Sequence, residues 1–254
     1  MSGFGSRSRA RRMALWAAVL VLFATTGARA QPLVAELSDH LVAITTDFTG
    51  TEVLLFGAID ADGDVAIVVR GPEVPLLVRR KARVAGVWAN RDEARFDSAP
   101  AFYAVASNRP IAEIAPRAEL ARNQIGVENL DLVATGEMDP ADEALFREAF
   151  IRNKQREGLY SVEPGKVIFL TGRLFRTDLY FPANVPVGTY TVQVFLVREG
   201  EVVSAQTTPL VISKVGVGAE IYLFANRHSA LYGLLAIAVA LMAGWLASLV
   251  FRRT

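Results

Sequence analysis

The sequence predicts a mainly β body that contains an inserted helical segment and is followed by one C-terminal transmembrane helix. Three observations lead to this fold class. Short runs rich in β-branched residues lie at both ends of the body, and a strongly helical segment lies between them. An uncharged apolar run then extends from Ser229 to Phe251, and about 20 apolar residues suffice for a helix to cross a bilayer.

Residues 1–30 have the three-part pattern of a secretory signal peptide. The apolar stretch from Met13 to Thr26 is too short to span a membrane comfortably, and Ala28-Arg29-Ala30 is a typical cleavage pattern before Gln31. The positive region that precedes the apolar stretch consists of Arg7, Arg9, Arg11 and Arg12. We expect cleavage, with retention of the segment as an uncleaved anchor as the alternative.

Residues 31–108 form the first predicted β segment. The runs LVAITTDF, TEVLLFGAI and VAIVVRGP are short and are bounded by turn residues. The Asp- and Gly-containing join from Asp60 to Asp64 predicts a hairpin turn between the last two runs. A calcium loop is the alternative for its three carboxylates, but Gly63 precedes Asp64, whereas the glycine of an EF-hand loop follows the third acidic position.

Three cations alternate along the segment PLLVRRKARVAGVWAN, at Arg79, Lys81 and Arg83. Alternate residues of a strand share one face, so we expect these side chains to lie together and Arg80 to face the other way. Such a face could bind a small anion, an acidic partner or lipid headgroups. The alternative is a charged edge strand that prevents unwanted sheet pairing.

Residues 109–158 form the predicted helical insertion. A helix over Ile111 to Gln124 would be interrupted or restarted at Pro116. A stronger helix is predicted over Asp139 to Glu157, with Asp139 as N-cap, proline in the first turn and Gly158 as the stop signal. Its expected apolar stripe consists of Leu145, Phe146, Ala149 and Phe150.

Residues 159–216 form the second β segment, which we expect to end in a closing hairpin. Four apolar residues alternate with other residues along the penultimate strand: Tyr190, Val192, Val194 and Leu196. A turn at Glu199-Gly200 leads into the returning strand. The Pro-x-Gly-x-Tyr entry at Pro186 is common in immunoglobulin-like sandwiches, so we predict one such β-sandwich with the helical segment inserted.

The C-terminal part comprises a juxtamembrane segment (residues 217–228), a transmembrane helix (229–251) and a short tail (252–254). Arg252 and Arg253 follow the apolar run directly, which favours a cytoplasmic C-terminus by the positive-inside rule. Small residues recur every fourth position in the helix: Ala236, Ala240, Gly244 and Ser248. Such a stripe lets another helix approach closely, so it is the candidate helix–helix interface.

Composition excludes several classes of function. Seven of the 27 Lys and Arg residues lie in the signal peptide and the tail, while all 26 Asp and Glu residues lie in the body. The body therefore carries a net charge of about −6, which argues against nucleic-acid binding. Without cysteine there is no thiolate metal site, no cysteine nucleophile and no disulfide.

Catalytic and metal-binding constellations are absent from the sequence. The two histidines, His40 and His228, are far apart, and no nucleophile motif accompanies either of them. An enzyme would therefore have to use carboxylates alone, as glycoside hydrolases do. The candidates are Glu113, Glu119, Asp131 and Glu143, but no spacing marks a pair. The sequence thus predicts no catalytic residues, no metal and no cofactor.

Several segments together carry a resemblance to a known family. They are TEVLLFGAI, VVRGPE, VRRKARVAGVWAN, FYAVASNRP, FREAFIRNKQREGLY, LFRTDLYFPANVPVGTYTVQVFLVREGEVV and FANRHSALYGLLAIAVALMAGWL. On these segments the chain resembles the alphaproteobacterial transmembrane protein family Alph_Pro_TM. The resemblance implies a Gram-negative inner-membrane protein with a periplasmic domain, and it brings no assigned activity and no functional residues.

The functional expectation is a membrane-anchored periplasmic accessory or scaffold protein. Its partners would be the lipid bilayer and another membrane protein, such as a polytopic transporter, or a second copy that associates through the transmembrane helix. A periplasmic module that binds or senses a small anion at the Arg79–Arg83 face is the alternative, and a carboxylate-dependent hydrolase is a third possibility.

Overall fold

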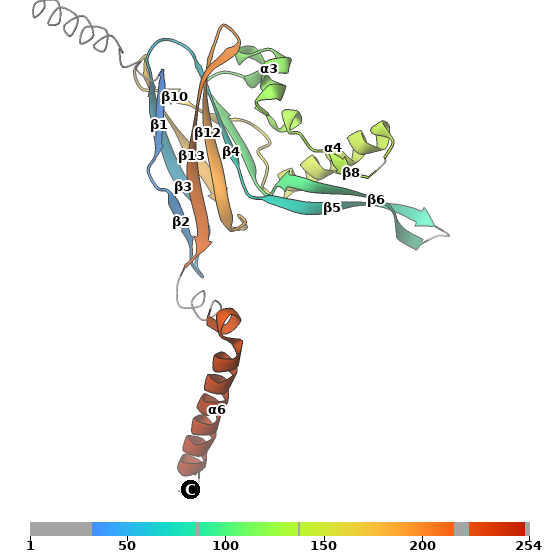
Figure 1. Cartoon of the computed structure of the whole chain (residues 1–254), viewed down its shortest axis with the longest axis vertical. Coiled ribbons are helices and arrows are strands. Elements are labelled where there is room, and N and C mark those ends of the chain that lie inside the picture. The colour runs from blue at the N-terminus through green and yellow to red at the C-terminus, as the bar shows by residue number, and fades with distance from the viewer. Residues whose placement is uncertain (1–31, 85–86, 137, 216–223, 252–254) are drawn as a thin grey trace, which may run out of the picture. The chain divides into compact units, whose positions relative to one another are not determined.

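The computed structural model describes residues 32–84, 87–136, 138–215 and 224–251, and strands dominate it (Figure 1). The first sheet has four antiparallel strands. Their order is β1 (Leu33–Leu37), β3 (Gly50–Ile59), β11 (Leu174–Pro182) and β10 (Ile168–Phe169). The predicted signal peptide and cytoplasmic tail lie outside the described residues.

The second sheet has six strands and contains the predicted closing hairpin. Their order is β2 (Leu41–Ile44), β13 (Glu201–Lys214), β12 (Gly188–Arg198), β4 (Asp64–Arg70), β7 (Tyr103–Ser107) and β9 (Gly165–Lys166). The pairs β2–β13 and β7–β9 are parallel, and the other neighbours are antiparallel. Because β3 pairs with β11 and β4 with β12, the two β segments of the sequence form the same two sheets.

The chain passes from one sheet to the other near its described start. β1 pairs with β3 in the first sheet, and β2 pairs with β13 in the second. The amide side chain of Gln206 on β13 bonds to both backbone groups of Ala35, accepting at 2.8 Å and donating at 2.6 Å. The two sheets are therefore joined by polar contacts along this side.

The inner faces of both sheets share one apolar core. β11 alternates between exposed and buried residues from Leu174 to Phe181, as expected for a strand with one face on the core. Tyr190 and Val194 are 0 % and 1 % exposed, which confirms their predicted core face. The aromatic ring of Tyr190 meets that of Phe181 on the first sheet edge to face, with centroids 5.9 Å apart. The mainly β fold class is confirmed.

The hairpin predicted at Asp60–Asp64 is wrong. β3 belongs to the first sheet and β4 to the second, so this turn carries the chain between sheets. Arg198 holds the turn, because its guanidinium bonds to the Asp60 carboxylate and to the carbonyl oxygens of Ala61 and Asp62. The hydrogen bond from Arg198 lowers the pKa of Asp60 below its usual value. Asp and Gly are favoured both in hairpin turns and in turns that connect two sheets, and only the strand pairing distinguishes these two cases.

A third sheet of three strands, β5 (Glu73–Val84), β6 (Val87–Pro100) and β8 (Ala134–Thr135), leaves the sandwich between β4 and β7. The long β5–β6 pair, called the ribbon below, is antiparallel. β8 pairs with β6 only at Phe96 and Arg95. The sequence pattern predicted strand here but not a separate sheet.

The helical insertion follows the expected plan. Pro116 separates α2 (Ile111–Ile114) from α3 (Arg117–Arg122), and a 3-10 turn, η1 (Val127–Asn129), comes next. The long helix α4 (Pro140–Arg156) begins after Asp139, whose carboxylate accepts from the Ala141 amide at 2.8 Å. Gly158 has a φ of 71°, a left-handed conformation that ends the helix readily.

Helix α4 buries a narrower face than its sequence suggested. Phe146 and Phe150 are buried, and the Phe150 ring lies 5.7 Å from that of Phe96 on the ribbon. Leu145, predicted for the same stripe, is 56 % exposed, so its predicted place in the apolar face is wrong. Neighbouring residues of a helix point about 100° apart. Leu145 is therefore turned towards solvent while Phe146 lies against Arg80 of the ribbon.

Helix α6 (Ser229–Phe251) is the one helix among the described residues that is long and apolar enough to cross a membrane. Its most apolar window has a mean hydropathy of 2.1, and none of that window is buried against the rest of the chain. This agrees with the predicted membrane span.

Candidate functional site

A polar cleft of about 540 Å³ lies where the second sheet, the base of the ribbon and the loop after α3 meet. Twelve residues line it: Arg70, Gly71, Pro72, Glu73, Ser98, Pro100, Gln124, Leu130, Asp131, Thr189, Thr191 and Gln193. Clefts of this size that bring polar side chains together are typical of small-molecule sites. We therefore take this cleft as the candidate functional site.

Arg70, the last residue of β4, provides the positive charge of the cleft. Strand pairing places it directly opposite Thr191 on β12 and Tyr103 on β7. Its guanidinium donates to the side-chain oxygen of Gln193 and, through Nη2, to the carbonyl oxygens of Asn123 at 2.9 Å and Gln124 at 3.3 Å. All of these acceptors are neutral.

The charge of Arg70 has no carboxylate within ion-pair distance among the residues that the structure describes. Its Nε atom is buried and has no hydrogen-bond partner there. Loss of hydration lowers the pKa of Arg70 below its ordinary value, although an arginine remains charged at neutral pH. A charged group that lies in a cleft and whose pKa is shifted by burial is a candidate for a functional role.

Tyr103 fixes the loop that forms one wall of the cleft. Its hydroxyl donates to the Gln124 carbonyl at 2.9 Å and accepts from the Gly126 amide at 2.8 Å. Gly126 has a φ of 98°, a conformation that other residues rarely adopt. Burial raises the pKa of Tyr103, so its hydroxyl stays protonated and able to donate. The wall is therefore held in place before any ligand binds.

The chain is closely packed around Gly71 and Pro72, two of the residues that line the cleft. A Cβ atom on Gly71 would lie 2.9 Å from the backbone nitrogen of Phe102, and one on Gly188 would lie 2.7 Å from the ring of Pro72. Neither contact is sterically acceptable. These glycines therefore let the β4–β5 junction pack closely against Phe102 and against the start of β12.

Sequence reasoning missed this cleft. Gln193 lies 123 positions from Arg70, so no local spacing links the two residues. One signal was present in the segment VVRGPE, where a single arginine ends a strand of five buried residues and precedes Gly-Pro. A charge at the end of such a strand needs a polar environment, which can be a functional site.

The candidate anion or partner face lies on the ribbon. Arg79 forms an ion pair with Glu93 on the neighbouring strand at 3.3 Å, and both side chains are more than half exposed. Lys81 and Arg83 continue along the same strand towards its end and are exposed. Arg80 pairs with Asp92 at 2.6 Å and with Asp142 of α4 at 2.9 Å, and it lies over the Phe146 ring. The ribbon is thus fastened to α4 through Arg80.

The small residues that form the stripe of α6 are all exposed. Ala236 and Ala240 line a shallow groove of about 660 Å³ along the helix, together with Tyr232 and Phe224. Gly244 and Ser248 lie one and two helical turns further along the same stripe and are exposed. Apart from its chain neighbours and the adjacent helix backbone, no atom of the described residues would lie within 4 Å of a Cβ atom at Gly244. The described part of the chain therefore leaves room there for another helix.

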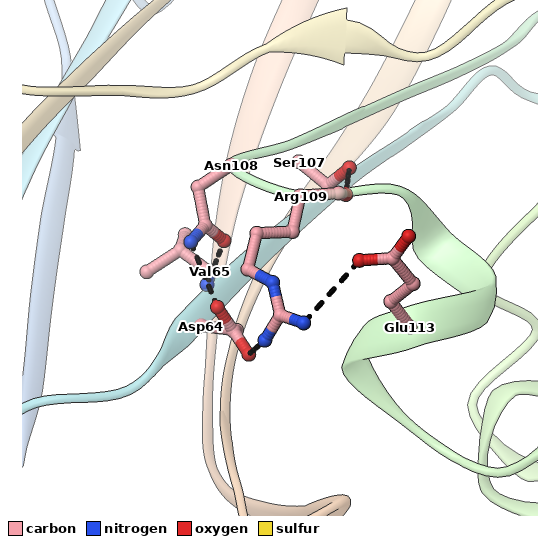
Figure 2. Close-up of polar contacts among 6 residues, drawn as sticks. All are labelled: Asp64, Val65, Ser107, Asn108, Arg109 and Glu113. Carbon is pink, nitrogen blue, oxygen red and sulfur yellow. Dashed lines mark hydrogen bonds and ion pairs between the residues drawn. The ribbon is translucent and has the colours of Figure 1, made fainter.

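A second polar cluster joins β4, β7 and α2 (Figure 2). Asp64 accepts from the Asn108 amide at 2.8 Å and from Arg109 at 3.1 Å, and Arg109 also pairs with Glu113 at 3.3 Å. Asn108 in turn accepts from the backbone nitrogen of Val65. These charges satisfy one another, so we assign the cluster a structural role.

The four carboxylates considered for hydrolysis lie in different surroundings. Glu113 pairs with Arg109, Glu119 with Arg122 at 2.6 Å, and Glu143 accepts from the Ala134 amide at 3.0 Å. Asp131 lies in the cleft. Among the described residues, no group of three or more His, Cys, Asp or Glu side chains could hold a metal ion.

Comparisons with known proteins connect this architecture to one family. The family model described as "Putative transmembrane protein (Alph_Pro_TM)" matches residues 32–253, which include both sheets, the cleft and α6. A search of curated proteins gives no match. Since the family match covers nearly the whole chain and α6 is long and apolar enough to span a bilayer, this protein belongs to the Alph_Pro_TM family of transmembrane proteins.

Proposed function

We propose that the protein is a membrane-anchored accessory or scaffold protein whose β body lies in the periplasm and binds a partner there. A polytopic inner-membrane protein such as a transporter is the first class of partner to test. In this proposal α6 holds the body at the membrane, and the partner is recognised by the open edge of the ribbon and by the exposed stripe of α6.

The free edge of the ribbon is the observation that supports partner binding most directly. β5 is a 12-residue edge strand, and no described strand pairs with its outer side. An open edge can accept an extended segment of another protein as an additional strand. Three of its exposed residues, Arg79, Lys81 and Arg83, are basic, which favours an acidic partner segment.

We also infer that the sandwich is immunoglobulin-like. The order β1-β3-β11-β10 corresponds to strands A, B, E and D of that fold, and β13, β12 and β4 correspond to G, F and C. At the start of β12 the Tyr190 hydroxyl donates to the Pro186 carbonyl at 2.6 Å, as in the tyrosine corner of such domains. Folds of this class commonly serve in recognition, although the fold alone does not establish a function.

The proposed topology predicts the behaviour of two fusions. Alkaline phosphatase fused after Ser213 should be active, because the body is outside the cytoplasm. The same enzyme fused after Thr254 should be inactive, since Arg252 and Arg253 keep the tail in the cytoplasm. Colony colour together with immunoblots for equal expression gives the measurement. Activity of the C-terminal fusion would contradict the orientation.

Partner binding is tested by co-purification of the full chain from mild detergent, with two variants that separate the two surfaces. Lys81→Glu reverses a charge on the ribbon and should remove a partner bound at that edge. Gly244→Leu keeps α6 apolar but fills the stripe, and it should remove a partner bound within the membrane.

The matched controls are Lys166→Glu, at an exposed position of β9, and Leu241→Ala, at a 70 % exposed position off the stripe. Both should retain the partner. Parent protein that keeps no stoichiometric partner in several detergents would contradict the accessory function.

A further inference from the structure

Three charged residues of both signs line the cleft, and none of them forms an ion pair within the described chain. Arg70 bonds only to neutral acceptors. Glu73 and Asp131 line the same cleft, and both residues are exposed. Neither carboxylate lies within ion-pair distance of a described cation. The other charged cluster near this sheet, around Asp64 and Arg109, satisfies its charges internally.

The donors beside Arg70 suit an anionic group. Gln193 presents its side-chain oxygen to Arg70, and its amide nitrogen bonds to no other described residue. The hydroxyl of Thr191, directly across from Arg70, likewise has no described partner. A carboxylate or similar anion at this end would receive hydrogen bonds from neutral donors and would meet the positive charge of Arg70.

The two carboxylates restrict the kind of ligand. An anion without a positive group would be repelled by Glu73 and Asp131, and a simple cation would be repelled by Arg70. A molecule that carries both charges can satisfy both parts of the cleft. We therefore propose that this cleft binds a small zwitterion, with its anionic group at Arg70 and its ammonium group at Glu73 and Asp131.

Amino acids are the simplest probes of this chemistry. The full chain in detergent micelles would be titrated with two series of ligands by isothermal titration calorimetry. The first series is the L-amino acids, and the second is the unbranched ω-amino acids from glycine to 6-aminohexanoate. The second series varies the distance between the charges, so its best member measures the separation that the cleft accepts. Hexanoate and hexylammonium, which carry one charge each, should bind about tenfold more weakly or worse, because each loses one set of charged contacts.

Variants of the cleft residues distinguish a loss of ligand binding from a loss of folding. Asp131→Asn and Thr191→Val change side chains that bond to no other described residue, so both should remain folded and bind the best zwitterion about tenfold more weakly. Arg70→Gln should abolish binding. Arg70 also holds the loop after α3, so the variant could lose binding by unfolding this loop. The circular dichroism spectrum of Arg70→Gln must therefore match that of the parent protein. Glu163→Gln, at an exposed site outside the cleft, is the matched control.

Three outcomes would overturn the proposal. One is the failure of every probe to bind the parent up to about 10 mM, a concentration that detects even very weak ligands. Another is equal binding of hexanoate and the zwitterion, which would indicate a plain anion site. The third is unchanged affinity in folded Asp131→Asn and Thr191→Val. Loss of a partner in the co-purification experiment does not bear on these results, because that experiment tests the ribbon and α6.

Discussion

Replacing Val194 with aspartate is expected to unfold the β body. Val194 is 1 % exposed in the middle of β12 and is surrounded by the core that both sheets share. A carboxylate there would be buried with no partner, which costs about 4 kcal/mol or more. Whole domains are stable by only about 5–15 kcal/mol. Urea unfolding of the full chain in detergent, followed by far-ultraviolet circular dichroism, measures the loss.

Gln193→Asp is the matched control for this substitution. Gln193 is the preceding residue on the opposite face of the strand, where its side-chain oxygen already accepts from Arg70. Aspartate would keep an acceptor near that cation, so we expect a change within about 1 kcal/mol. Equal destabilisation by the two substitutions would show that this strand is not oriented as described.

Truncation of Phe150 to alanine is the second change with a large expected effect. Phe150 is 3 % exposed, and its ring meets Phe96 of the ribbon and Tyr160, whose ring centroid is 5.6 Å away in an edge-to-face contact. Removing a buried aromatic ring typically costs about 3–5 kcal/mol. We expect α4 to detach from the ribbon, which limited proteolysis with mass spectrometry would detect as cleavage within α4.

Leu145→Ala provides the control on the same helix. Leu145 is 56 % exposed, so its truncation should change stability by about 0.5 kcal/mol or less. If Leu145→Ala loosened α4 as much as Phe150→Ala does, the packing of the helix on the ribbon would have to be reconsidered.

Local sequence patterns were sufficient to predict several helices and strands. Asp139, Pro140 and Gly158 mark the ends of α4, and the structure places the helix between them. The alternation around Tyr190 and Val194 marks the core face of β12, because the period of a strand is independent of its neighbours. The apolar run of α6 likewise needs no tertiary information.

The sequence alone therefore determined the mainly β class, the inserted helices, the membrane helix and the family. Only the tertiary structure decided which strands pair. This pairing shows that the turn at Asp60–Asp64 connects two sheets and that β5 and β6 form a separate ribbon. The cleft also depends on which strands pair. Arg70 and Gln193 meet because β4 pairs with β12, and Asp131 joins them because Arg70 and Tyr103 anchor the loop after α3. Strand pairing depends on the whole core that it buries, so a local pattern can predict a strand but not its neighbour.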